Sequence, residues 1–85
     1  MEKDTESDIN EEKIDDAALA LLYLTMHNDT FGTRAWKSID WDVMGRLYEK
    51  GYISNPQGKA KSVAITGEGE ERSKELFFRL FGANK

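Results

Sequence analysis

The chain has 85 residues, enough for one small domain, because a chain of this length buries only about 60% of the surface that it exposes when unfolded. Hydrophobic residues make up 39% of it and charged residues 33%, and 12 Lys and Arg against 16 Asp and Glu give a net charge of −4. With no Cys and a single His, the composition excludes a disulfide framework, thiolate and multi-His zinc sites and a Cys nucleophile, so we expect no metal and no cofactor.

The N-terminal segment has no charged region followed by an apolar stretch, the pattern of a secretory signal. The longest apolar run, Ala17–Leu24, is far shorter than the roughly 20 residues that a bilayer requires. We therefore expect a soluble, cytoplasmic protein with no membrane partner.

Acidic residues are concentrated at the start of the chain. Residues 1–16 carry a net charge of −6, so the rest carries +2. Ile9 is the only large aliphatic residue of 1–10 besides Met1, so burial cannot offset the entropy of ordering this segment. We expect a disordered acidic tail at 1–10 and a single domain over 11–82. The tail is interpreted as a solubilising segment, with a DNA-mimicking or regulatory arm as the alternative.

From Ile14 the chain is rich in Ala and Leu and apolar almost all round a helix. A helix without a polar face is a buried one, so we expect it at the centre, flanked by its own chain or by a second copy. Asn10 suits the N-cap, because its side-chain oxygen can accept from free amides. Turn-forming residues over His27–Thr33 are expected to end the helix.

A second helix is predicted from about Trp41 to Lys50, with Ser38 or Asp40 as its cap. Its apolar stripe, expected to face the core, consists of Trp41, Met44, Leu47 and Tyr48. Gly45 costs about 1 kcal/mol relative to Ala inside a helix, which predicts a close helix crossing or a bend there.

Gly51 is placed to end this helix, and a β-hairpin is predicted after it. Its strands are Tyr52–Ser54 and Ser62–Ile65, joined by a type I turn at Asn55–Gly58 and a basic tip. Thr66 can then cap a final helix from about Glu68 to Phe81.

The final helix has more apolar surface than one contact requires. Leu76, Phe77, Leu80 and Phe81 share a broad face, and Phe78 widens it. We therefore predict a dimer or partner interface at Phe77, Phe78 and Phe81.

Two segments carry a resemblance to known regulators. One is Arg46–Ile53, which contains the pattern Leu-x-x-Lys-Gly-x-Ile and resembles the recognition-helix segment of the MarR and PadR families. The other is Val63–Gly69, which has a hydrophobic residue two positions before Ile-Thr-x-x-Gly and resembles the wing segment of the same families. The resemblance covers roughly Trp41–Lys74. It implies a small α+β, winged-helix-like domain of three helices and a two- or three-stranded antiparallel hairpin or wing. Only about a dozen residues separate the first helix from Trp41, which departs from the spacing of a helix-turn-helix.

The whole chain is also similar to a small bacterial family of uncharacterised proteins. The similarity is carried by Ile14-Asp15-Asp16-Ala17 before the Leu-rich helix and by Arg34-Ala35-Trp36-Lys37 ahead of Asp40-Trp41-Asp42. It implies no function.

The resemblance makes Trp41–Lys50 a recognition-like helix and puts Lys59 and Lys61 in the wing. Six bases in the middle of the chain are the candidate nucleic-acid contacts: Arg34, Lys37, Arg46, Lys50, Lys59 and Lys61. Three acids among them leave a local net charge of +3, and Arg46 is expected to pair within its own helix with Asp42 and Glu49. A solvated polar face is the competing interpretation of these bases.

Neither His27 nor the Asp40 and Asp42 pair is accompanied by the further groups that catalysis or metal binding needs. We therefore expect a non-enzymatic domain with a regulatory or nucleic-acid-binding role and duplex DNA as its partner. The alternative is a protein-interaction or dimerisation module that binds a second copy or another protein and no DNA.

Overall fold

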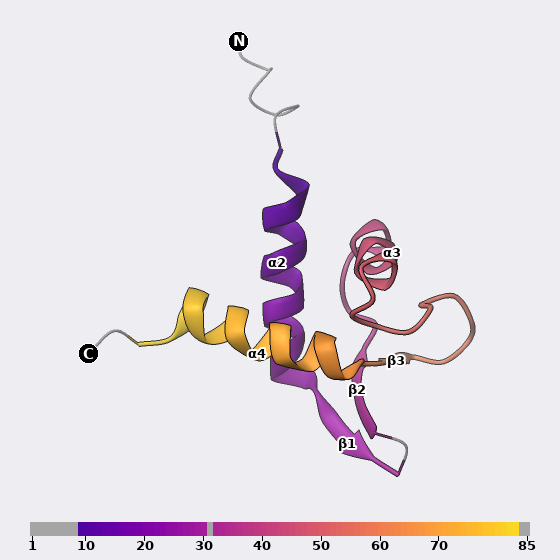
Figure 1. The fold of residues 1–85 in the computed structure, drawn as a ribbon. Helices are drawn as coiled ribbons and strands as arrows, with labels where there is room; N and C mark the ends of the chain where they lie inside the picture. The colour runs from indigo at the N-terminus through magenta and orange to yellow at the C-terminus, as the bar shows by residue number, and fades with distance from the viewer. Residues whose placement is uncertain (1–8, 31, 84–85) are drawn as a thin grey trace.

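A computed structural model describes residues 9–30 and 32–83, so most of the acidic tail predicted at 1–10 lies outside the described residues. The elements are α2 (Glu11–Leu22), the 3-10 turn η1 (Tyr23–Thr25), β1 (His27–Asp29), β2 (Gly32–Trp36), α3 (Trp41–Glu49), β3 (Ser62–Ala64) and α4 (Gly67–Phe81) (Figure 1). Three helices and a three-stranded antiparallel sheet confirm the prediction of a small α+β domain. No helix in the described ranges is long and apolar enough to cross a membrane.

The sheet has the strand order β1-β2-β3. His27 is paired with Arg34, and Ala35 is paired with Val63 on the other side of β2. The prediction of a turn over His27–Thr33 is wrong at both ends of that segment. The turn formers are themselves paired in the β1–β2 hairpin, Asn28 with Thr33 and Asp29 with Gly32, and Gly32, at the start of β2, has a φ of +122°.

Between α2 and α3, the described residues form η1 and the β1–β2 hairpin and no second helix. The helix-turn-helix of a winged-helix regulator is therefore not formed in the part of the chain that is described, and the resemblance to those regulators is not confirmed.

The predicted hairpin of Tyr52–Ser54 with Ser62–Ile65 is formed only in part. A single bridge joins Ile53 to Ile65, and the Ser54 amide donates to the Ala64 carbonyl at 2.9 Å. The main partner of β3 is β2, because the loop after Ser54 leaves the sheet before returning at Ser62.

The predicted helix caps are confirmed. The side chain of Asn10 accepts from the amide of Lys13, and Asp40, rather than Ser38, accepts from Asp42 and Val43. Thr66 accepts from the amide of Gly69 at 2.9 Å. Each of these side chains satisfies an amide that has no partner within its own helix.

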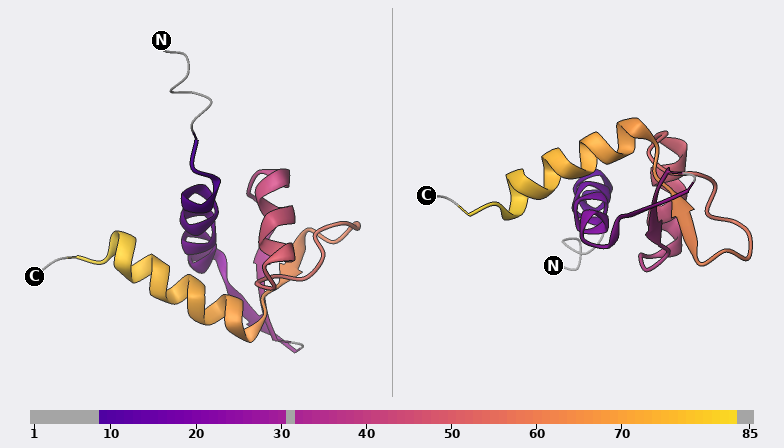
Figure 2. Two further views of the ribbon diagram at one scale, coloured as in Figure 1. Left: turned by 45° about the horizontal axis from the view of Figure 1, so that its top comes forward. Right: turned by 90° about the horizontal axis from the view of Figure 1, so that it is seen from below.

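The core lies where the three helices pack together with the sheet (Figure 2). Its largest fully buried apolar side chains are Leu19, Leu22, Met44, Leu47, Val63 and Leu76. Met44 and Leu47 are core residues as predicted, but Trp41 is 57% exposed and Tyr48 is 44% exposed, so half of the predicted stripe of α3 is wrong. The all-round burial of α2 is also wrong at Ile14 and Leu21, which are exposed.

The N-terminal end of α4 is held close to the loop after α3. Gly69 lies so near Tyr52 that an added Cβ would meet the Tyr52 carbonyl oxygen. The helix then crosses α2, and its C-terminal half projects beyond the crossing (Figures 1 and 2).

Candidate functional site

A buried carboxylate connects α2 to α3. Asp15 is 1% exposed, and both of its oxygens accept from the Arg46 guanidinium at 2.8 to 3.0 Å. The Lys50 ammonium donates to the same carboxylate at 3.0 Å. This Asp15 centre therefore pairs one buried negative charge with two bases four residues apart, Arg46 in α3 and Lys50 directly after it.

Two acids in the first turn of α2 extend the centre to the surface. Glu12 accepts from Lys50 at 3.0 Å, and Glu11 lies 3.7 Å from Arg46. Both carboxylates are exposed, so these outer ion pairs contribute little beside the buried one.

The pKa values of the three groups are coupled. Hydrogen bonds from Arg46 lower the pKa of Asp15, outweighing the burial that would raise it, and Lys50 lowers it further. Burial alone would lower the pKa of Lys50, but hydrogen bonds to Asp15 and Glu12 raise it overall. The hydrogen bonds to Asp15 raise the pKa of Arg46. All three groups are therefore charged at neutral pH, and the arrangement supplies no proton donor or acceptor poised for acid–base chemistry.

The six bases predicted to contact nucleic acid have three different environments. Arg46 and Lys50 hold the Asp15 centre. Arg34 donates to the side chain and carbonyl of Ser62 at 2.8 and 2.9 Å, which joins β2 to β3. The remaining three, which we call the loop lysines, are gathered around the loop between Ser54 and Ser62: Lys37, Lys59 and Lys61.

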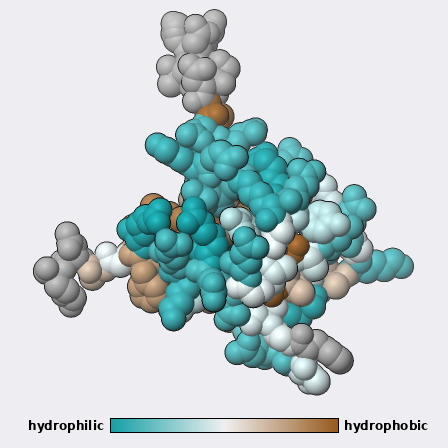
Figure 3. Space-filling model, in the orientation of Figure 1, coloured by the Kyte–Doolittle hydropathy of each residue, from teal (hydrophilic) through white to brown (hydrophobic). Residues whose placement is uncertain are grey.

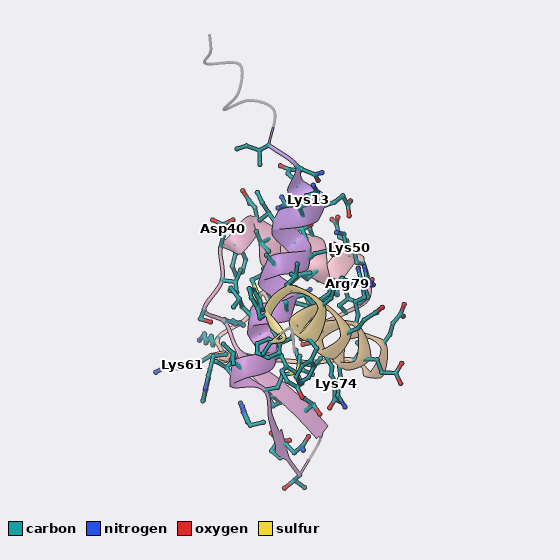
Figure 4. The ribbon with its side chains drawn as sticks, turned by 90° about the vertical axis from the view of Figure 1, so that its left-hand side faces the viewer. Lys13, Asp40, Lys50, Lys61, Lys74 and Arg79 are labelled. Carbon is teal, nitrogen blue, oxygen red and sulfur yellow. The ribbon has the colours of Figure 1, made fainter. Side chains whose placement is uncertain are left out.

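The loop lysines are brought together by the backbone. The amide of Lys37 donates to the carbonyl of Lys61 at 2.8 Å, and its ammonium donates to the carbonyl of Gly58 at 3.3 Å. Lys59 and Lys61 are exposed. Lys50 and Lys61 lie far apart in Figure 4, so Lys50 of the Asp15 centre and Lys61 of the loop lysines are not part of one cluster.

The expectation that Arg46 pairs with Asp42 and Glu49 in its own helix is wrong, because its hydrogen bonds go across to Asp15. Sequence reasoning missed Asp15 as a functional or structural centre. The signal was present, since Asp15 is followed by Ala18, Leu19 and Leu22 at spacings of three, four and seven, which places it on the buried face of the helix.

The three phenylalanines predicted to form an interface lie on the projecting end of α4. Phe77 is partly buried against the core and contacts Tyr23, with ring centroids 5.1 Å apart. Phe78 and Phe81 are 55% and 49% exposed, and each contacts the Phe77 ring. Hydrophobic surface is visible at this end of the molecule in Figure 3.

His27 is held by local contacts. Its Nδ1 lies 3.1 Å from the Thr25 carbonyl oxygen, and its ring packs on Trp36 at a centroid distance of 5.2 Å. Among residues 9–30 and 32–83, no cluster of three or more His, Asp or Glu side chains could hold a metal ion.

Residues 10–83 match the model of a family described as a domain of unknown function, DUF6429. The chain belongs to this family. The uncharacterized protein y4hR of Sinorhizobium fredii is 54% identical to this chain over 74 residues, which are 87% of this chain and 96% of that protein. The similarity to a small bacterial family of uncharacterised proteins is thereby confirmed. No solved structure matches the DUF6429 chain.

Proposed function

We propose that this protein is a non-enzymatic interaction module that self-associates through the projecting end of α4. The observation that carries the proposal is the exposure of three apolar side chains within four residues at the end of α4, namely Phe78, Leu80 and Phe81. Contiguous exposed apolar surface of this kind is typical of protein interfaces.

A second copy is the partner that the size of the chain favours. The domain leaves Phe78, Leu80 and Phe81 at the end of α4 about half exposed, and a chain of 85 residues buries a smaller fraction of its surface than a longer one. A two-fold axis buries the same patch on both subunits, so each exposed phenylalanine contributes twice. Aromatic side chains are enriched at such interfaces, because they bury a large area with few rotatable bonds.

Sedimentation equilibrium of the full chain tests the proposal. We expect a concentration-dependent dimer for the wild type and a monomer for Phe78→Ser/Phe81→Ser, with the same helical circular dichroism. Tyr48→Ser is the matched control, because it also removes an exposed aromatic ring but lies on α3. A wild type that stays monomeric at millimolar concentration would refute self-association.

Nucleic-acid binding is the second candidate function, and the loop lysines support it. Lys59 and Lys61 are exposed, and within the described residues their ammonium groups form no ion pair. The candidate contacts then reduce to Lys37, Lys59 and Lys61, because Arg46, Lys50 and Arg34 serve the fold. Three phosphate contacts imply weak, salt-sensitive binding.

A further inference from the structure

The side of α3 that faces away from the core borders a hollow of about 220 Å³. Its lining residues, which define what we call the Gly45 hollow, are Trp41, Gly45, Tyr48 and Glu49 from α3 and Asn55, Pro56 and Gln57 from the loop opposite. Pro56 is buried, so the loop wall of the hollow is anchored to the domain.

Two exposed aromatic rings stand on either side of a glycine in this hollow. Trp41 and Tyr48 are seven residues apart, which corresponds to about 10 Å along a helix, and Gly45 lies between them. Neither ring contacts another aromatic ring of the described residues. Each side chain is about half exposed, so both rings present aromatic surface to a flat group that enters the hollow.

Packing does not explain Gly45. A Cβ there would meet no atom within 4 Å, so the predicted close helix crossing is wrong, and the φ of Gly45 is not positive. Gly is nevertheless a poor helix former. What its missing side chain leaves open is the floor of the hollow.

The charge of the hollow is negative. Glu49 lines it, and its carboxylate has no hydrogen bond or ion pair with any described residue. Arg46 of α3 and Lys50, which follows α3, are turned toward α2, where they neutralise Asp15. This arrangement favours a cation and disfavours a phosphate group.

We propose that the Gly45 hollow binds the guanidinium group of an arginine side chain from an exposed segment of a partner protein. A guanidinium is flat, stacks on aromatic faces and donates two parallel hydrogen bonds to a carboxylate, so it matches all three features of the hollow. A lysine ammonium would match only the charge. The proposal is independent of self-association through α4.

The test is a titration of the ¹⁵N-labelled full chain with a short, capped Gly-Ser peptide that carries one arginine. Peptides with citrulline or lysine at the same position are the matched ligands. We expect saturable shifts of the Trp41 indole and the Gly45 amide at millimolar peptide, with the Trp36 indole unmoved as the internal reference. The citrulline and lysine peptides should bind at least about tenfold more weakly.

Two variants test the roles of Glu49 and Gly45 in binding. Glu49→Gln should lower the affinity for the arginine peptide about tenfold, whereas Glu68→Gln, an exposed acid on α4, should leave it unchanged. Gly45→Ala should also weaken binding while the thermal midpoint stays the same or rises, because the added methyl fills the floor and not the core. Absence of binding, equal shifts with citrulline, equal affinity for lysine, or an unaffected Glu49→Gln would each overturn the proposal.

Discussion

Asp15 on α2 and Arg46 on α3 are joined by three hydrogen bonds of 2.8 to 3.0 Å across 31 residues of sequence. The Asp15 carboxylate is buried, and the Arg46 and Lys50 side chains are about one quarter exposed. Removing the carboxylate would leave Arg46 and Lys50, at a helix interface, with only the exposed Glu11 and Glu12 as partners, which costs more than the pair itself contributes. The Asp15 centre thus fixes how α3 lies against α2.

Asp15→Ala is expected to lower the free energy of unfolding by about 3 to 5 kcal/mol, the usual cost of removing one partner of a buried ion pair. A domain of this size has only about 4 to 13 kcal/mol in total, so the loss is large. Urea denaturation followed by circular dichroism measures it. Asp16→Ala is the control, because Asp16 is adjacent on the chain and half-buried but forms no ion pair within the described range. Similar losses in both variants would contradict the assignment.

The free energy of unfolding should decrease as the pH is lowered in the acid range, partly because the Asp15 carboxylate becomes protonated. The pKa of Asp15 is lower in the folded protein than its unfolded value of about 3.9. Ionised Asp15 therefore contributes its full stabilisation at neutral pH, and the contribution is lost as the pH falls below about 5 toward the folded pKa. Urea denaturation at a series of pH values should show a shallower acid decline for Asp15→Asn than for the wild type. Parallel curves would show that other carboxylates dominate.

Gly69→Ala should destabilise the fold by about 1 to 3 kcal/mol, although Ala is the better helix former. The new Cβ would clash with the Tyr52 carbonyl, and neither backbone can move without breaking the Tyr52 bond to Thr66. Gly67→Ala is the matched control, since nothing lies within 4 Å of its added Cβ. Its free energy of unfolding should stay within about 0.5 kcal/mol of the wild-type value. A stable Gly69→Ala protein would mean that α4 does not approach Tyr52 so closely.

Weak DNA binding by the loop lysines would be detected by fluorescence anisotropy of a labelled duplex at low salt. Lys59→Ala/Lys61→Ala should reduce the affinity and lower the slope of log K against log salt by about two, one for each phosphate contact. Lys13→Ala/Lys74→Ala removes the same charge from α2 and α4 and should change the slope little. Removal of residues 1–10 should strengthen binding, because that segment is acidic. If both double variants weakened binding equally, the loop lysines would have no special role in it.

Local signals in the sequence were sufficient for the elements that depend on neighbouring residues. The Asn10, Asp40 and Thr66 caps could be predicted because the side chain bonds an amide two or three residues away. Gly51, with a φ of +84°, ends α3 for an equally local reason.

Long-range pairing could not be predicted in the same way. The spacing of Asp15 places it on the buried face of α2, but the two bases that pair with it, Arg46 and Lys50, reach it from across the domain and cannot be read from that spacing. Trp41 satisfies the spacing of a core stripe, yet α2 covers only the side of α3 that carries Met44 and Leu47. The periodicity predicts which residues share one face of a helix, but it does not show how much of that face other elements cover.

Ser73→Ala should cost about 1 to 3 kcal/mol, more than a typical polar substitution. Ser73 is fully buried, and its hydroxyl donates to the Leu19 carbonyl at 2.6 Å, which ties α4 to the last turn of α2. That turn tightens into η1, so the Tyr23 amide donates to the carbonyls of Ala20 and Leu21 and not to that of Leu19. The variant therefore leaves a buried carbonyl without its hydroxyl donor at the crossing that supports the projecting end of α4. Ser38→Ala, at an exposed site, is the control, and hydrogen exchange should show faster opening of α4 in Ser73→Ala alone. Unchanged exchange in α4 would show that apolar contacts at the crossing suffice.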